Sequence, residues 1–457
     1  MSENTTLEKR GNFTGKIGFV LAAAGSAVGL GNIWRFPYLA AEYGGGIFLL
    51  VYIILAVTFG FALMAAEILI GRKTGLSAIG AFKKLDKRFS FVGLLASIIP
   101  VIILPYYCVI GGWVMKYIAV FVTGNAHTAA DDGTYFVNFV SGTIQPIGWF
   151  LLFLALTAAI VLLGVEKGVE RVSKIMMPLL VVMMIGITVY ALCQPGSFEG
   201  IKYYIVPDFS RFSATTVLAA MGQLFYSMSL AMGIMITYGS YMKKDVNVES
   251  SVHNIEIFDT GIAFLAGLMI VPAVSAAGID MQKPGAGIMF IALPNVFDDM
   301  FGGTIIGLIF FILVFFAAIT SSISLMETVV SIVKDKFKFS RTISCLIVIG
   351  ICLLLGIPSA LSNENGILSG ITVLGKGFLN FFDFISNSVL MPIVALITCI
   401  FVGYVLKPKA LIAEAEECGN KFKAKRLFTV VIKYIAPICI VLILGFSILE
   451  AVGVIKV

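Results

Sequence analysis

Long stretches of apolar residues recur along the chain, and short polar segments separate them. Three of these stretches, residues 133–165, 175–198 and 212–242, contain no Asp, Glu, Lys or Arg. Each exceeds the roughly 20 residues that an α-helix needs to cross the apolar core of a bilayer. The pattern predicts an all-α polytopic membrane protein with eleven spans. The spans are expected near residues 17–40, 45–70, 90–122, 147–165, 173–194, 213–240, 255–278, 303–333, 342–360, 382–406 and 428–453.

The composition supports this fold class. Of the 457 residues, 59% are hydrophobic and only 13% are charged, and the mean hydropathy is +1.01. A water-soluble domain cannot bury so much apolar surface. The polar segment 1–11 precedes a full-length span rather than a short apolar core, so we expect no cleavable signal peptide. We expect residues 1–457 to form a single transmembrane domain.

The charged residues are distributed unevenly between the two sides of the expected membrane. If the N-terminus is cytoplasmic, most of the 32 Lys and Arg residues fall in cytoplasmic segments, among them 71–88, 166–174 and 407–426. This asymmetry follows the positive-inside rule and predicts a cytoplasmic N-terminus. An odd number of spans then places the C-terminus outside. Topology accounts for the net charge of +6, so we expect no nucleic-acid partner.

The sequence lacks the motifs of common enzyme classes. It contains no zinc-ligand spacing, nucleotide-binding loop or nucleophile elbow. The seven cysteines lie mostly inside apolar runs without paired spacing, so packing explains them better than a disulfide framework. We therefore expect a protein that is not an enzyme.

The first apolar run carries an unusual interruption, "GSAVGLGNIWRFPY", at residues 25–38. Gly25, Gly29 and Gly31 allow a helix to unwind at little cost. Irregular backbone persists inside a bilayer only where it lines a cavity or contacts other protein groups. Its free carbonyls and the Asn32 side chain can coordinate Na⁺, and the following half-helix offers amides to an anion. The alternative, that small residues only allow close helix packing, is the better explanation for Gly25 taken alone.

Two further polar clusters interrupt apolar spans. Glycine, glutamine and serine side chains break the run at residues 222–241, so we expect the sixth span to be discontinuous like the first. Thr320 and Ser321, in the eighth span, suit a cation site, although such hydroxyls can instead bond to the carbonyl one turn earlier. Residues 17–194 and 213–406 would each hold five spans and open with a broken helix. This is the pattern of an inverted-repeat transporter, with the eleventh span following.

Five motifs then occur in a familiar order: "GSAVGLGNIWRFPY", "GGGIFLL", "PYYCVIGGW", "GQLFYSMSL" with "ITYGSY", and "TSSIS". Through them the chain resembles the neurotransmitter:sodium symporter family over nearly its whole length. The resemblance implies the leucine-transporter fold, with a five-plus-five inverted repeat and discontinuous first and sixth helices. It also implies a multi-pass protein of the bacterial plasma membrane, which would be a monomer or a weak dimer.

The resemblance implies two sodium sites beside a substrate site. The first sodium site would take Ala27, Asn32, Ser227 and Asp259. The second sodium site would take Gly25, Val28, Ala317, Thr320 and Ser321. The substrate carboxylate would bind the first sodium ion, the amides of Leu30 and Gly31, and the Tyr107 hydroxyl. The rest of the substrate site would be lined by Ser26, Ala27, Gly29, Ile103, Phe225, Tyr226, Ser227, Ser229, Met232, Ser321 and Leu325.

Two charged pairs match the gates of the family. Arg35 with Asp383 would close the extracellular side, beneath which Tyr107 and Tyr226 would cover the substrate. Arg10 with Asp335 would close the intracellular side. Glu67 matches a buried acid of the second span that ties down the unwound backbone of the first and sixth helices. Glu327 is a further intramembrane acid, for which the sequence suggests only a cytoplasmic-side network.

Three residues set the expected ion dependence and substrate. Asp259 stands where the family usually has Asn, and a fixed negative charge there can replace the chloride ion of animal members. Gly29 stands where amine-transporting members carry Asp, so the substrate must bring its own carboxylate. Met232 and its aromatic neighbours favour apolar side chains, since methionine adapts to differently shaped partners. We therefore expect chloride-independent symport of hydrophobic or aromatic L-amino acids with Na⁺.

Two other readings of the same residues stay open from sequence alone. A membrane receptor could bind an amino acid without moving it, although two sodium sites with gates on both sides suit alternating access better. A channel would need a repeated filter lining its pore, and the sequence shows none.

Overall fold

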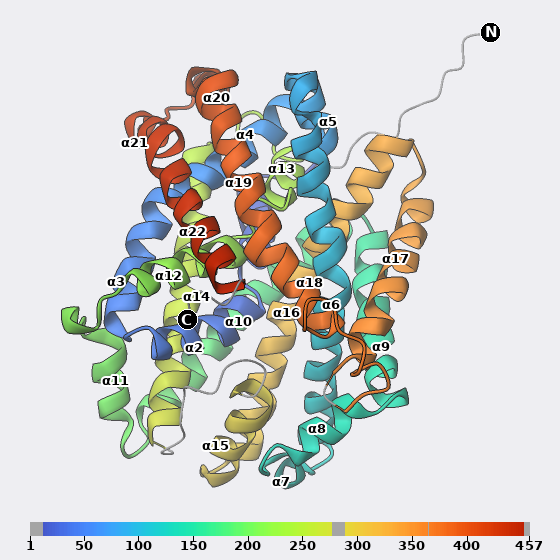
Figure 1. Ribbon diagram of the computed structural model, residues 1–457, viewed down its shortest axis with the longest axis vertical. Helices are drawn as coiled ribbons and strands as arrows, with labels where there is room; N and C mark the ends of the chain where they lie inside the picture. The colour runs from blue at the N-terminus through green and yellow to red at the C-terminus, as the bar shows by residue number, and fades with distance from the viewer. Residues whose placement is uncertain (1–11, 277–287, 364, 452–457) are drawn as a thin grey trace.

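The computed structural model describes residues 12–276, 288–363 and 365–451 as a bundle of helices (Figure 1). The first half of the chain contains the helices α1 (Lys16–Ala27), α2 (Phe36–Glu42), α3 (Gly46–Leu55), α4 (Phe61–Thr74), α5 (Ala78–Leu85), α6 (Ser90–Val122), α7 (Ala126–Ala129), α8 (Thr134–Ser141), α9 (Ile144–Leu162), α10 (Arg171–Leu192) and α11 (Ser197–Ile205). The second half contains α12 (Ala214–Ser227), α13 (Ile234–Gly239), α14 (Val248–Ala276), α15 (Leu293–Asp299), α16 (Gly303–Phe337), α17 (Arg341–Leu361), α18 (Phe378–Asp383), α19 (Met391–Ile400), α20 (Pro408–Ala415), α21 (Lys425–Val430) and α22 (Ala436–Ala451).

Several spans contain a wider, π-helical turn. These turns are η1 (Gly31–Arg35), η2 (Ala56–Gly60), η4 (Val165–Glu170), η6 (Ile288–Ala292), η7 (Phe384–Leu390), η8 (Phe401–Val405) and η10 (Val431–Ile435). Short 3₁₀ turns are η3 (Lys87–Phe89), η5 (Phe209–Arg211) and η9 (Glu417–Gly419). Three of these π-turns join two α-helices of one span: η2 joins α3 to α4, η7 joins α18 to α19, and η10 joins α21 to α22. Several predicted spans are therefore composite helices.

Within the described residues, nine continuous helical segments are long and apolar enough to cross a membrane. They are Gly46–Thr74, Lys87–Val122, Ile144–Leu162, Val165–Leu192, Val248–Ser275, Gly303–Phe337, Arg341–Leu361, Phe378–Val405 and Lys425–Gly445. A tenth span results if the bent pair Lys16–Ala27 and Gly31–Glu42 is counted as one, with 53° between its halves. The predicted sixth span corresponds to α12 and α13, which are too short singly and are separated by residues 228–233.

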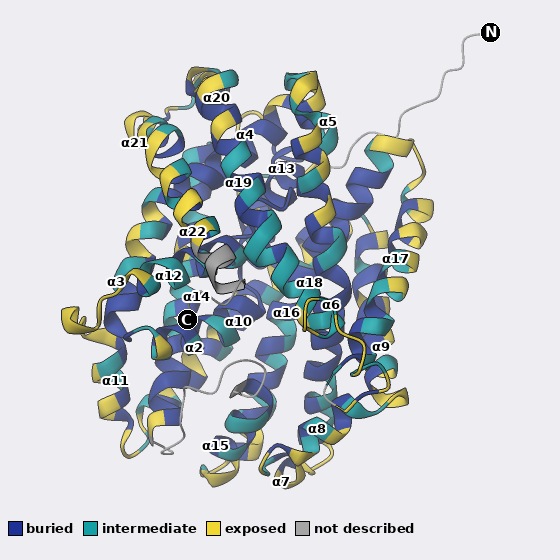
Figure 2. Cartoon of the chain, in the orientation of Figure 1, coloured by how far each residue is buried: buried dark blue, intermediate teal, exposed yellow. Residues whose placement is uncertain are grey.

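The predicted break in the first helix and the predicted break in the sixth are both confirmed. The broken helices lie inside the bundle, where α1 packs on α10, α14 and α16, and α13 packs on α4. Most side chains of the inner helices are buried, whereas exposed positions gather at the ends and on the outward faces (Figure 2). Exposed apolar side chains such as Val182, Leu346 and Leu354 suit contact with lipid tails.

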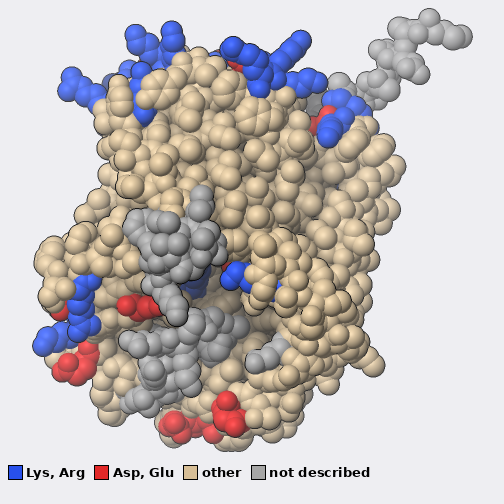
Figure 3. Space-filling view, in the orientation of Figure 1, with Lys and Arg blue, Asp and Glu red and all other residues tan. Residues whose placement is uncertain are grey.

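Lys and Arg side chains gather at one end of the visible face, where α5, α20 and α21 lie (Figure 3). The opposite end of this face shows Asp and Glu side chains. Both polar ends are separated by a broad surface of uncharged residues, as expected for a chain that crosses a bilayer.

The crossing of α4 and α13 depends on glycine. A Cβ atom on Gly239 would overlap the carbonyl of Ile68, and one on Gly71 would overlap the carbonyl of Ile236. The two backbones therefore touch directly. This close approach is typical of membrane helices that pack through small residues.

We expect Gly239→Ala to lower the free energy of unfolding by about 1–3 kcal/mol, because the added methyl group must push two packed backbones apart. Thermal unfolding of the purified protein in detergent measures this loss. Gly350→Ala in α17 is the matched control, because its Cβ would meet no atom within 4 Å. Equal unfolding temperatures for the two variants would contradict the proposed direct contact.

Candidate functional site

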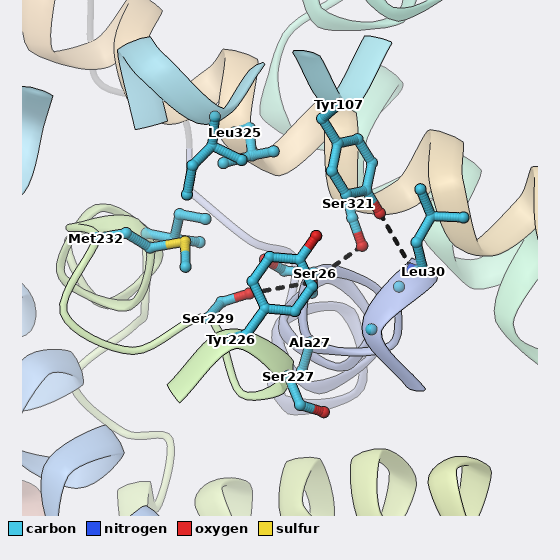
Figure 4. Close-up of a pocket in the computed structure, with 14 residues that line it drawn as sticks. Ser26, Ala27, Leu30, Tyr107, Tyr226, Ser227, Ser229, Met232, Ser321 and Leu325 are labelled. Carbon is cyan, nitrogen blue, oxygen red and sulfur yellow. Dashed lines mark hydrogen bonds between the residues drawn. The ribbon is translucent and has the colours of Figure 1, made fainter. Parts of the chain in front are cut away.

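A cavity lies where the broken helices face α6 and α16, and the space free of protein atoms there, with its opening included, is about 350 Å³ (Figure 4). The residues that line it are Ser26, Ala27, Gly29, Leu30, Gly31, Ile103, Tyr107, Tyr226, Ser227, Ser229, Met232, Ile234, Ser321 and Leu325. The structure therefore brings together segments that lie far apart in the sequence.

The residues expected around the substrate all line this cavity, with the exception of Phe225. Phe225 does not line the cavity and packs edge-on against Phe59, with 5.2 Å between the ring centroids. Ile234, the first residue of α13, lines the cavity and was missed by sequence reasoning. Its place directly after Gly233, at the resumption of the helix, is the signal that could have found it.

The backbone of the break in α1 is held by side chains from other elements. The N–H of Leu30 donates to the Tyr107 hydroxyl over 3.2 Å, and the N–H of Gly29 donates to Oδ1 of Asn32 over 3.1 Å. On the C-terminal side of the break, Gln223 Nε2 donates to the carbonyl of Gly31 over 2.8 Å. These bonds satisfy groups that an intact helix would pair internally.

One cluster of oxygen atoms lies between the break and α16. The Ser321 hydroxyl lies 3.4 Å from the carbonyl oxygen of Gly25 and 3.3 Å from that of Val28. Thr320 Oγ1 lies 3.2 Å from the carbonyl oxygen of Ala317. A Cβ on Gly25 would lie 3.3 Å from Cβ of Thr320, so the two helices touch here. The structure thus brings together the residues expected for the second sodium site.

A second cluster surrounds the buried carboxylate of Asp259 on α14. Its Oδ1 accepts hydrogen bonds from Asn32 Nδ2 over 2.8 Å and from the Ser227 hydroxyl over 2.7 Å. Its Oδ2 accepts from the Tyr52 hydroxyl over 3.1 Å. Ala27 lines the adjoining cavity together with Ser227. The four residues expected for the first sodium site therefore lie together. The polar cluster around Asp259 also includes Tyr52, which sequence reasoning missed.

Apart from Asn32, whose Nδ2 faces Asp259, the polar groups of both clusters present oxygen atoms: carbonyls, hydroxyls and one carboxylate. Such sets fit a hard cation and not a soft transition metal. Consistent with this, the described part of the chain contains no group of three or more His, Cys, Asp or Glu that could hold a metal ion. The chemistry of the donors fits Na⁺.

The linker between α12 and α13 has a strained backbone. Ser229 and Ala231 have φ values of 52° and 62°, a region that costs free energy for residues other than glycine. Two contacts hold it there. Oε1 of Glu67 accepts the N–H of Ala231 over 2.7 Å, and the Ser229 hydroxyl donates to the carbonyl of Ser26 over 3.0 Å. The two breaks are therefore tied to each other and to α4.

A vestibule lies on the other side of Tyr226, where the space free of protein atoms, with its opening to solvent included, is about 1780 Å³. Gly31 and Tyr226 line both the vestibule and the cavity, so they separate the two. Arg35 and Asp383, the expected outer gate, both line the vestibule but form no ion pair with each other in the described structure. Instead Arg35 lies 5.6 Å from the ring centre of Tyr226, and Asp383 accepts hydrogen bonds from Tyr106 and Asn387.

A family model of the sodium:neurotransmitter symporter family matches residues 10–132 and 140–454. This chain belongs to that family. Proteins similar in sequence include an uncharacterized sodium-dependent transporter, YhdH, from Bacillus subtilis. It is 35% identical over 95% of this chain and 97% of its own length. A sodium-dependent transporter from Haemophilus influenzae is 31% identical over 96% of this chain and 98% of its own.

A crystal structure of MhsT in complex with L-phenylalanine is similar to this symporter, with a TM-score of 0.88 and 38% sequence identity. The match covers 96% of this chain and 99% of MhsT. The leucine-transporter fold expected from the sequence is thereby confirmed. Members of the family are transporters, so the expectation of a non-enzyme is also confirmed.

At the end opposite the vestibule, buried polar contacts join neighbouring helices of the symporter. Glu327 forms an ion pair with Arg341 and accepts the Tyr241 hydroxyl over 2.8 Å. Arg341 also donates to the carbonyl of Val161 over 2.9 Å, so the network joins α16, α17 and α9. Asp335, one half of the expected inner gate, accepts the N–H of Ser77 over 2.8 Å. Its expected partner, Arg10, lies outside the described residues.

We expect Glu67→Ala to lower the free energy of unfolding by about 1–3 kcal/mol, because the buried N–H of Ala231 would lose its acceptor. Glu67→Gln retains an acceptor oxygen and should lose less. Thermal unfolding of both variants in detergent measures the difference. Equal losses would show that the negative charge, and not the hydrogen bond, holds the linker.

Proposed function

We propose that this chain is a sodium-coupled symporter that takes up hydrophobic L-amino acids, aromatic ones included, by alternating access. One observation carries the proposal: an apolar cavity has the Leu30 amide and the Tyr107 hydroxyl on one wall and adjoins two clusters of oxygen donors. The family's use of sodium supports the coupling. We further propose that each cluster holds one Na⁺.

The lining of the cavity supports an amino-acid substrate with an apolar side chain. None of the described residues that line it is Asp, Glu, Lys or Arg. A charged substrate group must therefore find backbone, hydroxyl or bound-ion partners. A carboxylate can accept the hydrogen of the Tyr107 hydroxyl, and it can accept the Leu30 N–H in place of the Tyr107 oxygen that accepts it in this structure. Ile103, Met232 and Leu325 form an apolar wall. MhsT has been crystallised with L-phenylalanine, which supports the same substrate class here.

Coupling follows from the closeness of the substrate and ion sites. Because Ala27 and Ser227 belong to the cavity and to the expected first sodium site, a substrate carboxylate there would complete the coordination of the ion. Each ligand then raises the affinity of the other by the same factor. Each positive charge carried inward adds about 2.3 kcal/mol per 100 mV of membrane potential.

Asp259 supports chloride independence. Its carboxylate lies within the expected first sodium site and supplies a fixed negative charge beside the cation. More distant relatives from dog and rat, 27% and 28% identical, are named sodium- and chloride-dependent taurine transporters, whereas YhdH is named sodium-dependent only. The fixed charge would do here what chloride does in those relatives.

The charge distribution supports the proposed orientation. The end with α5, α20 and α21 is rich in Lys and Arg and would face the cytoplasm of a bacterial cell (Figure 3). The vestibule beside Arg35 and Asp383 then opens outward. The bundle formed by the two repeats, residues 17–194 and 213–406, would then rock so that the inner gate parts, in a monomer or weak dimer.

Uptake into proteoliposomes tests the proposal. We expect labelled leucine, phenylalanine or tryptophan to accumulate only with an inward Na⁺ gradient, and to the same extent when gluconate replaces chloride. Gly29→Ala should abolish uptake, because its Cβ would lie 2.6 Å from Ser321 Oγ and 2.9 Å from the Tyr107 hydroxyl. Sodium-dependent binding without accumulation of any amino acid would favour a receptor instead.

Asp259→Asn isolates the role of the fixed charge. We expect uptake in gluconate to fall by roughly tenfold or more, since hydrogen bonds to charged groups are worth about 1.5–3 kcal/mol. Chloride should restore part of the loss. Asp245→Asn, at an exposed position, is the matched control and should behave like the natural protein. Full uptake by Asp259→Asn in gluconate would refute the chloride argument.

A further inference from the structure

A groove separates two wall segments at the Lys- and Arg-rich end of the molecule. One wall is formed by η8 and α20, and the other by α21 and η10. The groove holds about 1790 Å³ of space between them. Its lining residues come from a later part of the sequence than those of the cavity, and the two share no lining residue.

The groove concentrates positive charge. Its lining includes Lys407, Lys409, Lys425, Arg426 and Lys433, against a single acid, Glu416.

Lys425 pairs with Glu416 over 2.8 Å, and this hydrogen bond holds the pKa of Glu416 below its usual value. The acid is therefore ionised and neutralised by one lysine at neutral pH. Lys407, Lys409, Arg426 and Lys433 form no ion pair with any described residue. The groove thus presents a surplus of unpaired cationic groups.

The groove also lies where two apolar spans meet the polar end of the molecule. It joins the end of the span Phe378–Val405 to the start of the span Lys425–Gly445. Lys433 belongs to the second span, and its ammonium group lies 5.8 Å from the ring centre of Tyr404. Tyrosine is enriched at the membrane–water boundary, and a lysine near a helix end extends its ammonium group toward that boundary.

Apolar side chains continue the groove toward the middle of the membrane. Tyr404 is 53% exposed and Val430 is 46% exposed, and Tyr434 and Ile435 beyond them are also exposed. Cationic groups above exposed apolar groups match a molecule with an anionic head and an apolar tail. The positive-inside rule explains basic loops in general, but it does not require them to converge on one groove beside exposed apolar residues.

We propose that this groove binds the phosphate headgroup of an anionic phospholipid of the surrounding leaflet, with its acyl chains along Val430 and Tyr434. Basic pockets between transmembrane helices at the membrane surface are suited to such headgroups. The proposal is independent of which amino acid the protein transports and of whether it transports one.

Native mass spectrometry of the full chain tests this binding with dioleoylphosphatidylglycerol and dioleoylphosphatidylcholine as probes. We expect the natural protein to retain phosphatidylglycerol in preference to phosphatidylcholine. Arg426→Gln with Lys433→Gln should weaken phosphatidylglycerol binding by roughly tenfold or more, because each lysine or arginine near the surface attracts anionic lipid. Lys407→Gln with Lys409→Gln provides a second, independent variant on the other wall.

The matched control is Lys83→Gln with Lys87→Gln, which removes the same charge from exposed positions at the same end of the molecule. The control should bind phosphatidylglycerol as the natural protein does. Equal weakening by the control would show a general surface-charge effect and overturn the proposal. Equal retention of phosphatidylcholine, or unchanged binding by both groove variants, would overturn it as well.

Discussion

Inside a bilayer, a backbone amide or carbonyl that leaves a helix must find another partner, and the whole centre of this molecule follows from that constraint. The break after α1 frees such groups, and side chains from α6, α12 and α16 take them up through Tyr107, Gln223 and Ser321. The helices that form the cavity wall are therefore the same helices whose hydrogen bonds offset the free-energy cost of the break. The cavity and its scaffold cannot be separated.

The two ends of the molecule differ in how tightly polar groups hold the helices together. At one end, Glu327 and Arg341 are buried and paired, and Arg72 pairs with Glu414 over 3.2 Å. At the other end, Arg35 and Asp383 face an open vestibule and are not paired with each other. Breaking a buried pair is costly because it leaves a charge without compensation. The described polar side chains thus join the helices more firmly at the end opposite the vestibule.

The sequence was sufficient for the features that depend on local composition. Glycine clusters located both broken helices, and motif residues located most of the cavity wall. It could not settle features that depend on the rotation of one helix against another. Phe225 and Ile234 show this: both are apolar residues next to a break, yet one packs behind the wall and the other lines it. Likewise, only the packing of α16 against α17 shows that Arg341 forms an ion pair with Glu327.

Ser321 shows how a shortage of hydrogen-bond donors at the break affects a cation in the expected second sodium site. Its hydroxyl lies within 3.4 Å of three carbonyl oxygens, those of Gly25, Ser26 and Val28, but it has one hydrogen to give. At any instant, it can therefore serve only one of the three. The Ser26 carbonyl also accepts the Ser229 hydroxyl, so the carbonyl oxygens of Gly25 and Val28 are the ones that give the region beside Ser321 a negative potential before any cation arrives. Because that potential comes from the fixed geometry of the backbone, it does not depend on the pH of the surroundings.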